Sequence, residues 1–205
     1  MDTGRLEAFS DGVVAILITI MVLELKVPHD ASWGALLALK PVLLAYVLSF
    51  VYLGIYWNNH HHLIYATERV TGSVLWANLH LLFWLSLVPF ATAWMGENSF
   101  ATVPIAVYGC VLLAAGIAYT ILVRTIINQD GPSSKLAAAI GSDIKGYLSL
   151  ALYILAIPLA FVRNYIAGAI YAVVALMWLI PDPRIERRMG HELTENDERA
   201  PKRPL

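Results

Sequence analysis

The chain has 205 residues, of which 59% are hydrophobic and only 14% are charged, whereas soluble domains carry about 25% charged residues. Together with a mean hydropathy of +0.64, this composition excludes a water-soluble single domain and a disordered chain. The net charge of −1 provides no overall attraction to nucleic acid, so we expect no nucleic-acid partner.

Six apolar segments follow one another along the chain, and each approaches the ~20 residues that span a bilayer. They are Leu6–Leu25, Leu36–Trp57, Val70–Trp94, Val103–Ile126, Gly146–Val162 and Tyr165–Ile180. Only Arg163 and Asn164 separate the last two, which predicts a helical hairpin, and we expect Pro158 to kink the fifth. We therefore predict an all-α, polytopic membrane protein with six transmembrane helices in residues 1–181 and a polar tail in residues 182–205.

Lysine and arginine are distributed unevenly between the two sides of this predicted bundle. If both termini are cytoplasmic, the inner side carries six basic residues of the tail together with Arg5, Arg69, Arg124, Lys135 and Lys145. The outer side then carries only Lys26, Lys40 and Arg163. Because basic residues concentrate on the cytoplasmic side of membrane proteins, we predict cytoplasmic termini for this multi-pass chain.

The first apolar segment has the most informative pattern. At about 100° per residue, seven residues share one face of the helix: Arg5, Phe9, Gly12, Ile16, Thr19, Ile20 and Leu23. Asp11 points to nearly the opposite side, and an unpaired carboxylate in a membrane is costly, so we expect a neighbouring helix to bind it. Spacing alone leaves open whether Ile16, Ile20 and Leu23 simply face lipid or another helix.

The residues Arg5, Phe9, Ser10, Asp11 and Gly12 form an Arg-x-x-x-Phe-Ser-Asp-Gly motif. This motif resembles the signature of the transmembrane protein 175 family, the lysosomal potassium channels and their bacterial relatives. The similarity continues into the later helices at Trp57, His60, His61 and Asn78. In the family these residues belong to the motif and to the structural network around it.

The resemblance implies a homotetramer in the plasma membrane, with a central pore lined by the first helix of each subunit. It implies that Ile16, Ile20 and Leu23 form apolar rings that constrict the pore in place of a carbonyl filter, with Thr19 as a hydroxyl ring that contributes to ion selectivity. The permeant ion is then potassium, and we expect no cofactor. Because potassium is larger than sodium and less tightly hydrated, such a constriction should favour it modestly.

Three interpretations of the histidine run His60–His62 remain open. Histidines at a helix end interact favourably with the helix dipole, so a structural role is one. In the family version, His60 or His61 meets the Ser10–Asp11 region together with Trp57. The third is a metal site. We expect no metal, because the histidine-rich membrane di-iron enzymes need several clusters and this chain has only 6 histidines.

Two functions from other classes compete with the potassium channel. The first is a proton channel or a proton-coupled transporter that uses Asp11 and the pair His60 and His61. The second is the membrane metal enzyme, which the small number of histidines disfavours. The sequence contains no glycine-rich phosphate loop, no Ser-His-Asp set and no Cys-x-x-Cys motif, so we predict that the protein is not an enzyme.

Overall fold

The computed structural model describes residues 3–131, 134, 136–137 and 143–179. All regular structure in these residues is helical. The elements are α1 (Thr3–Leu23), α2 (Trp33–Ala38), α3 (Lys40–Tyr65), α4 (Gly72–Ser86), α5 (Val88–Glu97), α6 (Thr102–Asp130), α8 (Ile144–Val162) and α9 (Asn164–Leu179). The predicted all-α class is confirmed, while the predicted tail at 182–205 lies outside the described residues.

Five segments of the described chain are long and apolar enough to cross a membrane. These are α1, α3, the pair α4 and α5 taken together, α6 and α8. The predicted sixth span corresponds to α9, an apolar helix of 16 residues. At 1.5 Å per residue it is about 24 Å long, shorter than the ~30 Å hydrocarbon core. The chain is therefore a multi-pass membrane protein.

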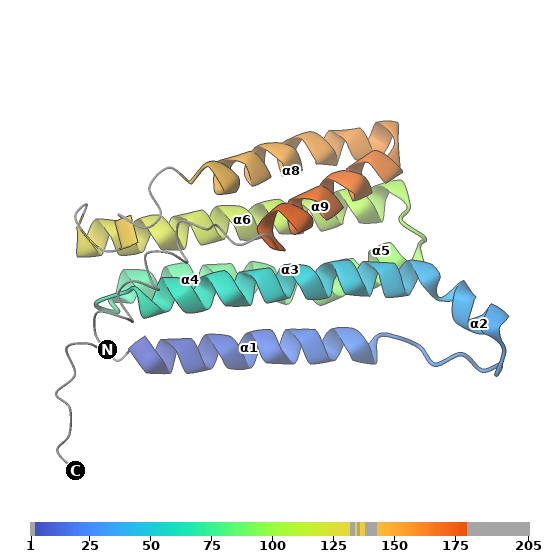
Figure 1. The fold of residues 1–205 in the computed structure, drawn as a ribbon, viewed down its shortest axis with the longest axis horizontal. Helices are drawn as coiled ribbons and strands as arrows, with labels where there is room; N and C mark the ends of the chain where they lie inside the picture. The colour runs from blue at the N-terminus through green and yellow to red at the C-terminus, as the bar shows by residue number, and fades with distance from the viewer. Residues whose placement is uncertain (1–2, 132–133, 135, 138–142, 180–205) are drawn as a thin grey trace, which may run out of the picture.

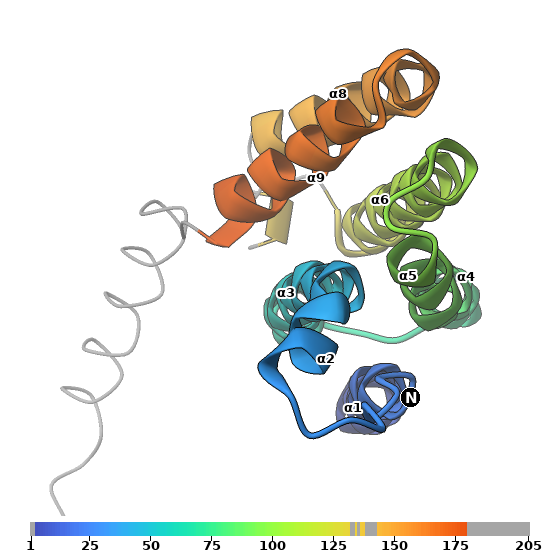
Figure 2. The ribbon, with the colours of Figure 1, turned by 90° about the vertical axis from the view of Figure 1, so that its right-hand side faces the viewer.

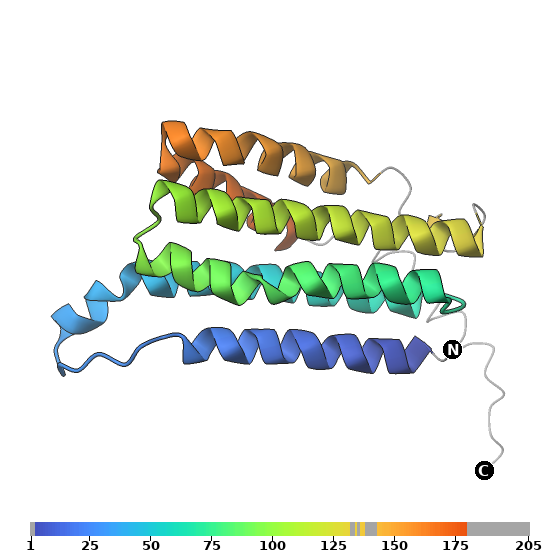
Figure 3. The same ribbon diagram turned by 180° about the vertical axis from the view of Figure 1, so that it is seen from behind.

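The long helices lie side by side with their axes roughly aligned (Figure 1). Seen end-on, α1 is at one edge of the subunit and packs against both α3 and the α4–α5 pair (Figure 2). On the other side of these helices lie α6 and the hairpin of α8 and α9. Seen from behind, α4 and α5 follow one another along α6 (Figure 3). Helix α1 thus contacts neighbours on one side only.

Three fully buried tyrosines join the helices on the side of α3 that faces away from α1. The Tyr52 hydroxyl donates to the Tyr171 carbonyl oxygen at 2.6 Å, and the Tyr171 hydroxyl donates to the Ile105 carbonyl oxygen at 3.2 Å. Tyr108 and Ser49 are joined through their hydroxyl oxygens at 2.9 Å. Every one of these buried hydroxyls has a partner, as groups without access to water require. Helices α3, α6 and α9 are therefore fixed to one another by both packing and hydrogen bonds.

The predicted third span, Val70–Trp94, is not one continuous helix. It divides at Leu87 into α4 and α5, and Pro89 stands in the first turn of α5. Proline has no N–H for the carbonyl four residues earlier and its ring clashes with that carbonyl, so the helix ends and restarts here. Pro158, the residue expected to cause a kink, lies inside α8 without dividing it.

The predicted second span, Leu36–Trp57, is also displaced along the chain. The structure places the short helix α2 first, and α3 begins at Lys40 with Pro41 in its first turn. Proline is well suited to a helix start because the first N–H groups have no partner within the helix. Helix α3 then continues past Trp57 to Tyr65, so the histidine run belongs to its last turns.

Candidate pore-lining helix and its anchor

The first helix has two faces of opposite character. Its buried face packs against the rest of the subunit through Leu6, Ser10, Val14, Leu17 and Met21. Its other face carries what we call the exposed stripe, which consists of Phe9, Ile16, Thr19, Ile20 and Leu23. Ile16 is 57% exposed and Leu23 is 79% exposed, whereas Leu17 is 6% exposed. The face predicted from spacing is therefore the one that the subunit leaves uncovered.

Thr19 is the polar member of the exposed stripe. Its Oγ1 donates a hydrogen bond to the Ile16 carbonyl oxygen at 2.9 Å within the same helix. This contact uses the only hydrogen of the hydroxyl, so the oxygen lone pairs remain available on the exposed side. The side chain therefore offers an acceptor, which is the polarity that a cation requires.

Asp11 lies away from the exposed stripe, on the flank of α1 that faces α3. Its Oδ1 accepts a hydrogen bond from Trp57 Nε1 at 3.0 Å. One turn earlier, Glu7 Oε1 contacts His61 Nδ1 at 2.7 Å. Trp57 and His61 are themselves one turn apart on α3, and their rings stack with centroids 6.3 Å apart. The predicted contact of Asp11 with a neighbouring helix is confirmed, and it is one of two parallel links.

A second, fully buried set of contacts joins α1 to α3 and α4. His60 Nε2 is 2.7 Å from Asn78 Oδ1, and Asn78 Nδ2 donates to Ser10 Oγ at 3.0 Å. Ser10 Oγ in turn donates to the Leu6 carbonyl oxygen at 2.9 Å. Because the Asn78 amide nitrogen is directed at Ser10, its oxygen faces His60, which places a hydrogen on His60 Nε2. We call these contacts, with those of Glu7 and Asp11, the anchor.

The anchor brings together most of the residues that the family resemblance assigns to the motif and to the network around it. Ser10, Asp11, Trp57, His60, His61 and Asn78 all take part in it. Glu7 takes part as well, and sequence reasoning missed it. The signal was present, because Glu7 and Asp11 are four residues apart on one helix, as are Trp57 and His61, and such pairs lie on the same helix face.

Three motif residues are outside the anchor. Arg5 and Phe9 are exposed near the beginning of α1. Gly12 is also exposed, and a Cβ atom added to it would meet nothing within 4 Å. Nothing in the described part of the subunit therefore requires glycine at position 12, although it lies on the same face as the exposed stripe.

The described residues contain no group of three or more His, Cys, Asp or Glu side chains that could hold a metal ion. His60 and His61 instead use ring nitrogens to contact Asn78 and Glu7. These contacts join the end of α3 to the Ser10–Asp11 region beside Trp57, which is the arrangement that the family resemblance implied.

Comparison with known proteins agrees with this geometry. The family model described as endosomal/lysosomal potassium channel TMEM175 matches residues 5–89, a range that includes the anchor and the exposed stripe. A potassium channel of Chryseobacterium sp. (strain P1-3) is 58% identical over 92% of this chain and 98% of its own length.

The chain belongs to the TMEM175 family.

The fold agrees with the family as well. The crystal structure of a lysosomal potassium-selective channel TMEM175 homolog from Chamaesiphon minutus matches with a TM-score of 0.75 and 31% identity. The match covers 86% of this chain and 96% of that chain. An endosomal/lysosomal proton channel TMEM175 of Bos taurus is 29% identical to this chain. The match covers 77% of this chain and 36% of that protein. The family is one of ion channels.

Proposed function

We propose that this chain is the subunit of a potassium channel whose pore is lined by α1. The observation that carries the proposal is the division of α1 into an anchored face and an exposed, mainly apolar stripe. Relatives of the chain in Chryseobacterium and Chamaesiphon are named as potassium channels or as potassium-selective. A face that is apolar, uncovered and opposite to a dense polar anchor is suited to meet copies of itself around an ion path.

The proposed assembly is a homotetramer, as the family resemblance implies. One helix presents a single stripe, so several copies are needed to enclose a pore. Four copies related by a closed rotation would place four identical side chains at each level of the stripe. The similarity to the Chamaesiphon channel supports this arrangement. The subunit would then contribute its α1 to the centre and its α6, α8 and α9 to the periphery.

In the proposed pore, Ile16, Ile20 and Leu23 form three apolar rings. At 1.5 Å per residue, their spacing along the helix places the second ring about 6 Å beyond the first and the third about 4.5 Å beyond the second. A narrow apolar constriction gates by dewetting and makes a passing ion lose hydration water. Potassium holds its water less tightly than sodium, so it loses less on passage. The Thr19 oxygens, with their hydrogens directed to the backbone, replace part of that water.

Ile16 is the ring that we assign as the gate. It is the ring nearest to the beginning of α1, which we place at the cytoplasmic side on the basis of the lysine and arginine distribution. Isoleucine is β-branched and stiff at χ1, so four copies make a defined plug. The proposed location is the plasma membrane, with both termini in the cytoplasm and potassium as the permeant ion.

Proton permeation is a second candidate function. It is favoured by the name of the bovine relative, an endosomal/lysosomal proton channel, and by the titratable groups Glu7, Asp11, His60 and His61 in the anchor. The geometry gives this candidate less support, because all four groups lie away from the exposed stripe and have partners within the anchor. Glu7 contacts His61, Asp11 accepts from Trp57, and His60 contacts Asn78.

One recording separates the two candidates. The purified chain is reconstituted into a lipid bilayer, and reversal potentials are measured with opposed gradients of potassium, sodium and protons. We expect the reversal potential to follow the potassium gradient, with a smaller contribution from sodium. A reversal potential that follows the proton gradient alone would overturn the potassium assignment.

A further inference from the structure

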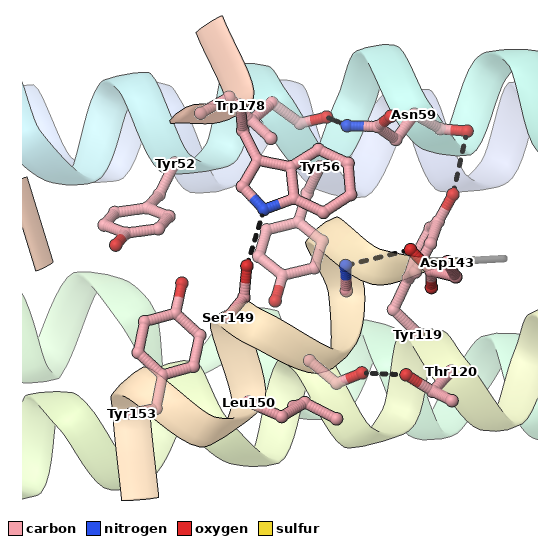
Figure 4. A pocket seen from close by; sticks show the side chains of 13 residues that line it. Tyr52, Tyr56, Asn59, Tyr119, Thr120, Asp143, Ser149, Leu150, Tyr153 and Trp178 are labelled. Carbon is pink, nitrogen blue, oxygen red and sulfur yellow. Dashed lines mark hydrogen bonds between the residues drawn. The ribbon is translucent and has the colours of Figure 1, made fainter. Parts of the chain in front are cut away.

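A pocket lies within the subunit, on the far side of α3 from the anchor. It is lined by residues of α3, α6, α8 and α9 and by Asp143, and it is open on one side. Figure 4 shows side chains from all four helices directed toward it. Because α1 does not contribute to its lining, the pocket is separate from the proposed ion path.

The walls of the pocket are aromatic. The rings of Tyr52 and Tyr153 lie with their centroids 6.4 Å apart, and those of Tyr56 and Tyr119 lie 6.2 Å apart. Trp178 closes the pocket from α9 (Figure 4). The four tyrosines come from three different helices, so the pocket exists only when the subunit is folded.

Hydrogen bonds hold several of these rings in place. Trp178 Nε1 donates to Ser149 Oγ at 2.8 Å. The Tyr119 hydroxyl donates to the Asn59 carbonyl oxygen at 3.3 Å, and the Tyr52 hydroxyl is bound to the backbone of α9. A ligand would therefore meet a largely pre-organised wall, which lowers the entropic cost of binding.

Asp143 is the one charged side chain among the described residues that line the pocket. It precedes α8 as its N-cap residue, and its Oδ1 accepts a hydrogen bond from the Gly146 N–H at 2.9 Å. The carboxylate is therefore fixed at the wall and brings negative charge to it. The described lining contains no lysine or arginine to neutralise that charge.

Aromatic faces and a carboxylate select one class of ligand. The faces of tyrosine and tryptophan are electrically negative and attract cations, above all when the site is shielded from water. An anion would be repelled by Asp143, and an organic cation gains contact with the aromatic faces through its alkyl groups. We infer that this pocket binds an organic ammonium ion, with its alkyl groups against the tyrosine rings and its charge near Asp143.

Choline and its neutral carbon isostere provide the matched probes. In the isostere a tert-butyl group replaces the trimethylammonium group, so size and shape are kept and only the charge is lost. Binding to the full chain in lipid nanodiscs is measured by saturation-transfer NMR and by calorimetry, without any need for ion current. We expect choline to bind and the isostere to bind roughly tenfold more weakly, as the loss of a shielded cation–π contact predicts.

Two substitutions locate the site. Tyr56→Leu removes one aromatic wall, whereas Tyr56→Phe keeps the ring and removes only the hydroxyl. Asp143→Asn removes the charge but keeps a good N-cap for α8, so the fold is retained. We expect Tyr56→Leu and Asp143→Asn each to weaken choline binding several-fold and Tyr56→Phe to leave it nearly unchanged. Tyr165→Leu is the control, because Tyr165 is exposed at the beginning of α9.

The outcomes are decisive in either direction. Equal binding of choline and its isostere would mean an apolar pocket without cation selectivity, and would overturn the inference. Absence of binding, or binding that neither Tyr56→Leu nor Asp143→Asn alters, would overturn it as well. If Tyr56→Leu does not yield folded protein, Asp143→Asn alone decides. Because the readout is binding, failure here leaves the proposed channel function untouched.

Discussion

Helices α1 and α6 have similar hydropathy but opposite roles in the subunit. In its most apolar stretch α6 is 50% buried, whereas α1 is only 28% buried. Helix α6 packs against α4, α5, α8 and α9, while α1 contacts α3, α4 and α5 on one side. Composition does not distinguish them. The difference teaches that α6 is the scaffold of the subunit and that α1 is held to the scaffold by one face.

Two glycines show the same contrast at the level of single atoms. A Cβ atom at Gly109 in α6 would lie 2.0 Å from the Tyr171 hydroxyl oxygen and 2.8 Å from Tyr171 Cζ. A Cβ atom at Gly12 in α1 would meet nothing within 4 Å. In α6 the absence of a side chain is required by the subunit itself. In α1 it leaves space on the face where we propose that other copies meet.

The largest effect is expected for Gly109→Ala. The added methyl group must displace Tyr171, which is fully buried and bound to the Ile105 carbonyl oxygen. Overpacking of this kind costs about 1–3 kcal/mol. We expect a lower thermal unfolding temperature of the purified protein and less folded protein in the membrane.

Gly12→Ala is the matched control for that comparison. Alanine is preferred over glycine in a helix by about 1 kcal/mol and meets no neighbour among the described residues here, so the subunit should be at least as stable as before. We expect any change to appear in assembly or current. A loss of stability equal to that of Gly109→Ala would show that the two helices do not differ as described.

The next effect concerns the anchor. Asp11→Ala leaves Trp57 Nε1 without its acceptor, and an unsatisfied donor costs about 1–3 kcal/mol. Because Trp57 is half-exposed in the subunit, we expect about 1 kcal/mol. The yield of assembled channel, measured by size-exclusion chromatography, should fall.

Asp11→Asn is the informative companion to this variant. Its side-chain oxygen can still accept from Trp57, so assembly should be largely restored. If Asp11→Ala assembles normally and changes only ion selectivity, Asp11 belongs to the permeation path and not to the anchor.

The third prediction concerns the exposed stripe. Ile16→Asn introduces a polar ring that wets the proposed constriction and lowers its barrier. Current should rise several-fold, and sodium should pass more easily. Ile18→Asn is the control, because Ile18 packs against the subunit core and should reduce folding without opening the pore. If Ile18→Asn causes the leak and Ile16→Asn does not, the pore is lined by the face of α1 that carries Ile18 and not by the exposed stripe.

The smallest effect is expected for Thr19→Val. The two side chains are close in shape, but valine lacks the oxygen that we propose replaces water around the ion. The loss of a hydrogen-bond-like contact of about 0.5–1.5 kcal/mol predicts a few-fold fall in the potassium-to-sodium permeability ratio while current persists. Thr19→Ser keeps the oxygen and should preserve the ratio. An unchanged ratio in Thr19→Val would remove Thr19 from the proposed selectivity site.

Some features of this protein depend only on local periodicity, and the sequence by itself determined them. Apolar runs of bilayer length identify the membrane spans, because every backbone polar group in lipid must bond within its own helix. The helical repeat placed Ile16, Ile20 and Leu23 on one face and Asp11 on another. The structure agrees with this placement, because the buried residues of α1 recur with the period of the helix and leave the opposite face exposed.

The family resemblance implied only that His60 or His61 meets the Ser10–Asp11 region together with Trp57, and the tertiary structure decided which side chains pair. The choice of Trp57 as the partner of Asp11, of Glu7 for His61 and of Asn78 for His60 depends on which helices are neighbours and how they are aligned along their axes. The aromatic pocket beside Asp143 was equally absent from the local pattern. Contacts between distant segments are set by helix packing, which no periodicity within a single helix encodes.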